Sequence, residues 1–269
     1  MSSFSDKNLM GNMSWLEYKN AVCVEKRPLL IPVGAIEQHG PHLPLSTDVL
    51  IPEAICREVA KRVGCVVAPS MSYGYKSMPH SGGGQHFCGS TGLDAHTLIQ
   101  QALDLVRGFT DHGVENIVFV IGHMENQWFL TEACDLAYRE ARQQNKPLKI
   151  MRVGYWEFVK TKTLDQVFGE NMPPWDLEHA GIMETSLMLH SYPEMVNMEL
   201  LEPQTCATLP VYDVWPYDQS KIPESGILNN AIGASEEIGE IFFEEFVSGM
   251  SKAIQYEFNK LQKDQRIES

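Results

Sequence analysis

Short apolar runs alternate with longer amphipathic stretches along this chain. The runs of strand length lie at residues 28–34, 65–69, 115–122 and 148–155. Apolar residues recur at helical spacing at 15–18, 52–63, 93–112, 127–144, 178–190 and 231–263. Strands that alternate with helices predict an α/β fold with a mainly parallel sheet that helices cover on both faces.

Three segments show neither the apolar runs of a strand nor the apolar spacing of a helix, and they are expected to be loops. Residues 71–92 are rich in glycine and serine, residues 169–176 contain paired prolines, and residues 200–228 carry four scattered prolines. Loops as long as 71–92 usually have a function in a compact domain. Since no change of composition marks a linker, residues 1–269 are expected to form a single domain.

Charge and cysteine content exclude several classes of partner. The chain has 35 acidic and 21 Lys and Arg residues, for a net charge of −14, which argues against a nucleic acid partner. No apolar run reaches the roughly 18 residues of a membrane span, and residues 1–15 do not resemble a signal peptide. The six scattered cysteines contain no CxxC pair and favour a cytoplasmic protein with reduced thiols.

The stretch at residues 34–48, GAIEQHGPHLPLSTD, follows the first predicted strand and concentrates metal-binding side chains. Glu37 and His39 are two residues apart, so on an extended chain they point to the same side. Asp48 follows after a turn with glycine and proline. Mixed carboxylate and imidazole ligands suit zinc or manganese better than calcium or magnesium.

Two further acid and histidine groups complete the pattern. His123 and Glu125 follow the strand at 115–122, and Glu178 and His179 lie near the start of the helix at 178–190. Ligands of parallel α/β sheets bind outside the carboxyl ends of the strands, so the groups after strands are expected to meet at one edge. Each group alone could consist of ordinary solvated surface residues, but together they predict two divalent metal ions that share Asp48.

This pattern indicates hydrolysis of an amide or cyclic amide, because metal ions lower the pKa of water toward about 7 and polarise a carbonyl. His179 is a candidate acid for the leaving nitrogen, and an ordinary hydrogen-bonded histidine is the alternative. His42 is expected to orient a ligand. Trp156 and Trp175 could bind a planar cationic group, or could pack in the core.

Four motifs give a more specific interpretation. EQHGPHLPLSTD, the loop GYKS with SGGG, GHMEN and WDLEHAGIMETSLML occur in the order and at the spacing of the creatininase (creatinine amidohydrolase) family, which the chain resembles from about residue 15 to 258. The resemblance implies a three-layer α/β/α sandwich, a homohexamer, and two zinc or manganese ions in each subunit.

The resemblance also implies roles for individual residues. The positions that match metal ligands are Glu37, His39, Asp48, His123 and Glu125, with Asp48 as the bridge, and it stays open whether Glu178 is also a ligand. The positions expected to take part in catalysis are Glu125, Glu178 and His179. The substrate is expected to contact Ser81, Met124, Trp156, Trp175 and Asp176.

One departure concerns the substrate. Creatininase proper has a tyrosine inside GHxEN, and Met124 takes its place here, so an aromatic face and a hydroxyl are lost. His80, directly before Ser81, also changes the pocket. The expected reaction is the reversible opening of creatinine to creatine. The alternatives are hydrolysis of another lactam or a formamide and, third, a metal-dependent binding or assembly protein without turnover.

Overall fold

A parallel four-stranded sheet forms the centre of the molecule. The computed structural model describes residues 7–264, without the side chains of 259–264, so the ends of the predicted 1–269 domain lie outside it. The strand order is β2-β1-β3-β4, with bounds β1 Leu29–Val33, β2 Val66–Val67, β3 Asn116–Ile121 and β4 Lys149–Gly154. Val33 lies opposite Ile121, and Ile121 lies opposite Gly154. The carboxyl ends of three strands are therefore level at one edge.

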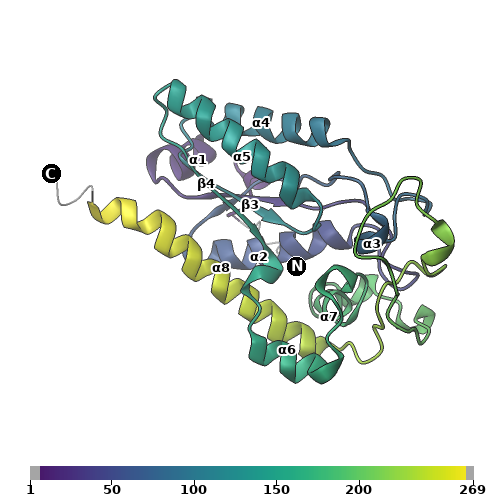
Figure 1. The fold of residues 1–269 in the computed structure, drawn as a ribbon. Helices are drawn as coiled ribbons and strands as arrows, with labels where there is room; N and C mark the ends of the chain where they lie inside the picture. Colours follow the sequence, from purple (N-terminus) through teal and green to yellow (C-terminus); the bar gives the residue numbers. More distant parts are fainter. Residues whose placement is uncertain (1–6, 265–269) are drawn as a thin grey trace.

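Helices cover both faces of this sheet, as the alternation in the sequence predicts. Figure 1 shows α4 and α5 on one face and α2 and α8 on the other, with α7 beside α8. The bounds are α1 Trp15–Lys19, α2 Thr47–Val63, α3 Pro79–Gly82, α4 Ala95–Asp111, α5 Asn126–Gln143, α6 Thr161–Phe168, α7 Ile182–Ser191 and α8 Glu236–Asp264. The three-layer α/β/α fold class is confirmed.

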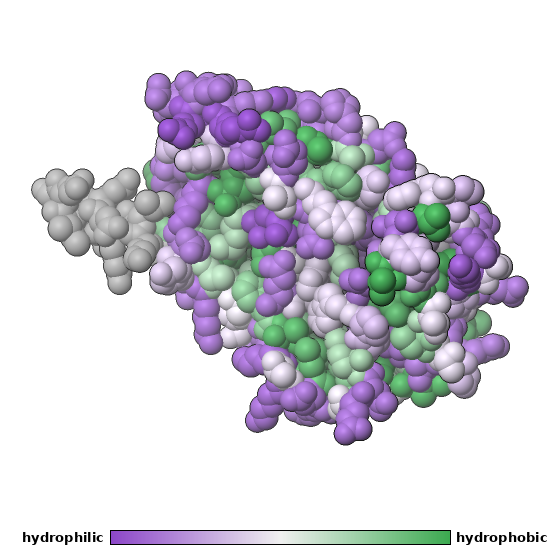
Figure 2. Space-filling model, in the orientation of Figure 1, coloured by the Kyte–Doolittle hydropathy of each residue, from purple (hydrophilic) through white to green (hydrophobic). Residues whose placement is uncertain are grey.

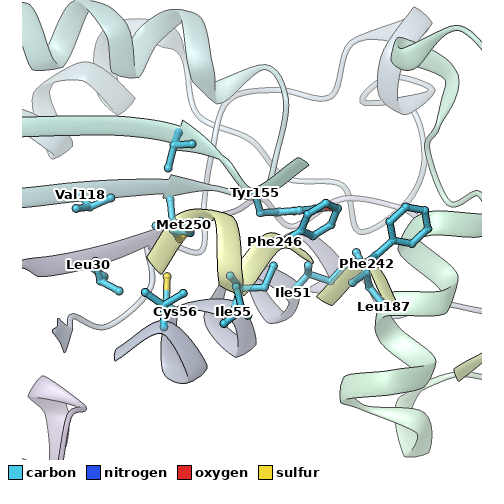
Figure 3. Packing of buried hydrophobic residues seen from close by; sticks show 14 of the residues in the cluster. Leu30, Ile51, Ile55, Cys56, Val118, Tyr155, Leu187, Phe242, Phe246 and Met250 are labelled. Carbon is cyan, nitrogen blue, oxygen red and sulfur yellow. The ribbon is translucent and has the colours of Figure 1, made fainter. Parts of the chain in front are cut away.

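Side chains of the strands supply two cores, one on each face. Leu30 and Val118 pack with Ile55 of α2 and Phe246 of α8, as Figure 3 shows. The alternate positions, such as Ile31, join the core beneath α4 and α5. All five residues of β1 are buried because helices lie on both of its faces, which is why this strand has no polar alternation.

Helix α2 begins five residues earlier than the sequence predicts. Proline favours the first turn of a helix, so the start was expected at Pro52, but Pro52 is the sixth residue of α2. A proline ring has no N–H to donate to the carbonyl four residues before it, here Asp48. The early start places Asp48 in the first turn of the helix rather than in the preceding loop.

Three further elements of the structure differ from the elements that the sequence predicts. Helix α6 was not predicted, and the loop at 71–92 contains the short helix α3. Helix α7 starts at Ile182, so Glu178 and His179 lie in the loop before it, after a 3₁₀ turn at Trp175–Leu177. Within residues 7–264, no helix is long and apolar enough to cross a membrane.

Candidate metal centre

Four predicted ligands meet at the carboxyl edge of the sheet. Glu37 and His39 follow β1, His123 follows β3, and Asp48 comes from the first turn of α2. His123 Nδ1 lies 3.0 Å from Glu37 Oε2 and 3.1 Å from Asp48 Oδ2. His39 Nε2 lies 3.1 Å from Asp48 Oδ1. Each of the four residues is at most 3% exposed, so the cluster is closed to bulk water on most sides.

Asp48 stands between two halves of this cluster. Its Oδ1 faces His39 and its Oδ2 faces His123. Three groups of three residues have ligand atoms within 4.8 Å of one another. Two of them share Asp48, namely Glu37, Asp48, His123 and His39, Asp48, Glu184, and the third consists of Glu37, His39 and His179. The geometry of the side chains therefore suits a carboxylate that bridges two ions.

Glu184 is the residue that the sequence analysis missed. Its Oε2 lies 3.7 Å from His39 Nε2 and accepts a hydrogen bond from Ala180 N at 2.7 Å. The side chain comes from the first turn of α7. A signal was present, because Glu184 interrupts a run of apolar residues in a buried helix, where an unpaired carboxylate would be costly.

Glu178 belongs to none of the three-residue groups among the described residues, and whether it is a ligand stays a prediction. Its Oε1 accepts a hydrogen bond from Met183 N at 2.6 Å, and its Oε2 accepts one from Asn229 Nδ2 at 3.1 Å. The carboxylate thus satisfies an amide at the start of α7. Glu184, and not Glu178, supplies the carboxylate beside His39.

Glu125 lies at the margin of the cluster rather than within it. Its Oε2 is 3.3 Å from His123 Nε2, and its Oε1 accepts hydrogen bonds from Ser81 Oγ at 2.5 Å and Met78 N at 3.2 Å. Glu125 belongs to none of the groups with ligand atoms within 4.8 Å among the described residues. It is placed between the cluster and the glycine-rich loop, where it can hold a proton or a water molecule.

Several polar atoms of the cluster are buried without a hydrogen-bond partner within the described part of the chain. They are Glu37 Oε1, His39 Nε2, Asp48 Oδ2 and His123 Nε2. The last three lie within ion-pair distance of another group of the cluster but form no hydrogen bond with it. Such an atom costs about 1–3 kcal/mol unless something satisfies it. Carboxylate oxygens and imidazole nitrogens are ligands of zinc and manganese, so the residues fit a pair of divalent ions.

The electrostatics of the cluster also favour a bound cation. Burial raises the pKa of Glu37 to about 7 and that of Glu184 to about 8, since both carboxylates are removed from water near other acids. Burial opposes the charged form of His39, but Asp48 and Glu184 outweigh it and raise its pKa to about 10. Without metal, protons must neutralise these acids, and metal ions would displace those protons.

His179 has a defined hydrogen-bonding arrangement. Its Nε2 lies 2.8 Å from the carbonyl oxygen of Gln38, which can only accept, so Nε2 carries the hydrogen. The side-chain amide of Gln38 donates to the carbonyls of Gly82 and Gly226. Burial, with His39 nearby, holds the pKa of His179 well below its usual range. The neutral ring therefore keeps Nδ1 free to accept a proton.

His42 is buried but is not part of the metal-binding groups. Its Nε2 lies 2.9 Å from Thr185 Oγ1, next to Glu184. Burial, and after it His39, lowers the pKa of His42 to about 4, so the ring is neutral at physiological pH. The contact is with Thr185 rather than with a metal-binding side chain, and the orienting role of His42 stays a prediction.

A pocket opens directly over the cluster. Among the described residues, its wall includes all five predicted substrate contacts, which are Ser81, Met124, Trp156, Trp175 and Asp176. Glu125, Glu178 and His179 also line it. Trp156 stands edge-on to Tyr155, with ring centroids 5.1 Å apart, and packs against the cores as well. Trp156 therefore packs in the core and lines the pocket, and its binding of a planar cationic group stays a prediction.

Two glycines at the strand ends allow helix α2 to approach the sheet. A Cβ at Gly34, after β1, would lie 2.5 Å from the carbonyl oxygen of Asp48, and one at Gly122, after β3, would lie 2.1 Å from it. No side chain can occupy such a space, so the backbone of Asp48 rests on the sheet edge. This contact positions the shared carboxylate between the two strands.

A parallel α/β/α sheet that holds carboxylates and imidazoles in a buried cluster at its carboxyl edge, beneath a pocket, is typical of a metal-dependent hydrolase. The family model described as creatininase, creatinine amidohydrolase, matches residues 11–254. The chain belongs to the creatininase family.

Individual relatives agree with this assignment. A creatinine amidohydrolase of Pseudomonas putida is 43% identical over 93% of this chain and 96% of its own length. Two solved creatininases, a mutant of the Zn-Zn type and a Mn form, superpose with a TM-score of 0.90 at 42% identity. Each structural match covers 93% of this chain and 98% of the other.

Proposed function

We propose that this protein opens the ring of creatinine with water to give creatine, in a reversible reaction at two divalent metal ions. The observation that carries the proposal is the pair of three-residue groups that share Asp48 beneath a pocket with two tryptophans. The Pseudomonas putida relative, named a creatinine amidohydrolase, supports this choice of substrate.

We assign one ion to Glu37, Asp48 and His123, and the other to His39, Asp48 and Glu184. Zinc and manganese are the proposed metals, because the donor set suits both and related structures are described with each. Bound ions would supply Lewis acidity toward the carbonyl and lower the pKa of water. The protein supplies the donors, their spacing and a pocket largely shielded from water.

The remaining residues bind the substrate and move protons. Trp156 and Trp175 offer aromatic faces to the planar guanidine part of creatinine. The water oxygen bonds to the carbonyl carbon, the ring C–N bond breaks, and the ring nitrogen gains a proton. His179 can take a proton at Nδ1 and deliver it, while Glu125, hydrogen-bonded to Ser81, is the second acid and base at the pocket.

Met124 favours a second candidate within the same scaffold, namely hydrolysis of another lactam or a formamide. Its flexible thioether lines the pocket where creatininase proper has a tyrosine, so one hydroxyl contact is missing. A binding or assembly protein without turnover is the third candidate, and the free Nδ1 of His179 argues against it because a purely structural site needs no available base.

A substrate panel tests these candidates. Protein loaded separately with zinc and manganese is incubated with creatinine, hydantoins, other lactams and formamides, and product formation is measured. We expect creatine from creatinine with at least one metal. Turnover of a formamide or another lactam in place of creatinine would establish the second candidate, and no turnover of any compound would favour the third.

We also propose a homohexamer of single-domain subunits in the cytoplasm. Exposed apolar side chains support an assembly, since Val211 is 99% and Trp215 is 71% exposed in the isolated chain. The six free cysteines suit a reducing compartment. The family match, which covers residues 11–254, supports one domain.

A further inference from the structure

His80 lies between two carboxylates that belong to different segments. Its Nε2 is 3.5 Å from Asp176 Oδ2, and its Nδ1 is 3.3 Å from Asp213 Oδ1. Asp176 lies beside Trp175 in the 3₁₀ turn at the pocket. Asp213 lies in the segment 209–217, which covers α3 from outside. One imidazole ring therefore joins the pocket wall to a segment almost forty residues further along the chain.

The short helix α3 that carries His80 is fixed to the metal centre. The carbonyl of Gly82 accepts hydrogen bonds from Gln38 Nε2 at 3.0 Å and from Ser77 Oγ at 2.9 Å. Ser81 donates to Glu125. His80 thus projects from a helix whose neighbours hold their positions through buried contacts, and it can serve as a fixed attachment point.

The turn at Trp175–Leu177 has a polar side-chain contact to this helix. Its backbone hydrogen bonds are local, from Leu177 N to Pro174 O and from Glu178 N to Trp175 O. Within residues 7–258, the side chain of Asp176 forms an ion pair with His80 and with no other residue. Trp175 also packs against the core that contains α8, and Leu177 is buried with Ile222 and Leu228. His80 adds a polar contact to these apolar ones.

We propose that His80 is a positioning residue that ties the Trp175–Asp176 turn and the segment 209–217 together and so keeps Trp175 over the bound substrate. The inference rests on the proposed function of the pocket. We expect these two contacts of His80 to affect substrate binding, because His80 does not reach the metal cluster.

His86 provides a matched control. It lies on the same glycine-rich loop, and its Nδ1 is 3.2 Å from Tyr217 Oη, so it also contacts the segment 209–217. It does not contact the turn at Trp175–Leu177. The substitution His86→Ala therefore removes a histidine contact to the outer segment while the link to Asp176 remains.

Hydrogen exchange followed by mass spectrometry tests the tie without any substrate. The wild type is compared with His80→Ala, Asp213→Asn, the double variant and His86→Ala in peptides that cover 172–178 and 209–217. We expect faster exchange in both peptides for His80→Ala, and no change at 172–178 for His86→Ala. The double variant should match His80→Ala alone, because the two residues act through one contact. Unchanged exchange at 172–178 in His80→Ala would overturn the proposal.

Steady-state kinetics with creatinine then separates binding from chemistry. For His80→Ala we expect KM to rise about five- to tenfold and kcat to change less than about twofold, as for lost contacts that act equally on substrate and transition state. A fall in kcat at unchanged KM would show that His80 acts in the chemical step and would overturn the proposed role. If the wild type does not turn over creatinine, the proposed function is wrong. The exchange experiment needs no substrate, so it still tests whether His80 holds the Trp175–Asp176 turn and the segment 209–217 together.

Discussion

Asp48 presents its two oxygens to different imidazoles, and this arrangement makes it the central residue of the site. Glu37 and His123 lie on one side of it, and His39 and Glu184 lie on the other. Two ions held in this way depend on one carboxylate, whereas each of the other ligands serves one ion. Substitutions at Asp48 and Glu184 should therefore differ in how many ions are lost.

The metal content of variants tests this difference. We expect Asp48→Asn to lose both ions, because each three-residue group would lose its shared anion, and Glu184→Gln to lose one. Glu178→Gln, which alters a carboxylate outside both groups, should keep both ions. Elemental analysis of chelator-free preparations measures the content. An Asp48→Asn protein that keeps two ions would disprove the bridge.

Most of the candidate ligands could be predicted from the sequence, since Glu37, His39 and His123 directly follow strands that meet at one edge. Glu184 could not be predicted in the same way, because its place beside His39 depends on how α7 docks against the site. Glu178, next to His179, seemed the better candidate by spacing. The structure shows that a buried carboxylate can serve a helix end instead of an ion.

Among the elements, helix α7 depends most directly on a titratable group. Glu178 accepts a hydrogen bond from Met183 N, one of the free amides at the helix start. Burial raises the pKa of Glu178 to about 7, and the hydrogen bonds from Met183 and Asn229 only partly oppose this shift. In the unfolded chain the same carboxyl has an ordinary pKa near 4.5.

The pH dependence of stability follows from this difference. Between about pH 4.5 and pH 7 the unfolded chain has lost the proton that the folded protein retains, so stability falls as pH rises through this window. At about 1.4 kcal/mol per pKa unit, the loss is up to about 3.5 kcal/mol. Glu178→Gln should remove this part of the slope, and Glu170→Gln, at an exposed position, should not. Urea unfolding of chelator-treated protein at pH 5 and pH 8 measures it; an unchanged slope in Glu178→Gln would contradict the assignment.

The boundaries of the elements were harder to predict than the elements themselves. The period of the apolar residues alone predicts the strands and the long helices, and the structure contains them. The starts of α2 and α7 were missed because Pro52 looks like a first-turn proline and because the acids at 176 and 178 resemble a helix start. Both errors fall at the site, where the chain departs from regular geometry to place side chains.

At the scale of the whole molecule, the segment 209–217 leaves a large apolar surface uncovered. Val211, Tyr212, Val214 and Trp215 are all more than half exposed. Figure 2 shows hydrophobic side chains on the lobe at the right, where Figure 1 places this part of the chain. Neighbouring exposed apolar side chains are typical of contact surfaces, so we expect this segment to lie in a contact between subunits.

Sedimentation velocity tests this expectation. The double substitution Val211→Asp and Trp215→Ser should shift the hexamer toward smaller species, because a buried charge and a lost aromatic anchor both weaken an interface. The control Tyr138→Ser removes an exposed aromatic residue from α5 and should leave the assembly unchanged. A hexamer that survives the double substitution would place the interface elsewhere.

The level carboxyl ends of β1 and β3 also determine when the site can form during folding. Residues 39 and 184 are far apart in the chain, and their side chains meet only after parallel strands have paired and α7 has docked. Contacts of such high sequence separation form slowly and late. Metal ions would therefore bind a chain that is already native in its sheet, and their stabilising effect would appear as slower unfolding rather than faster folding.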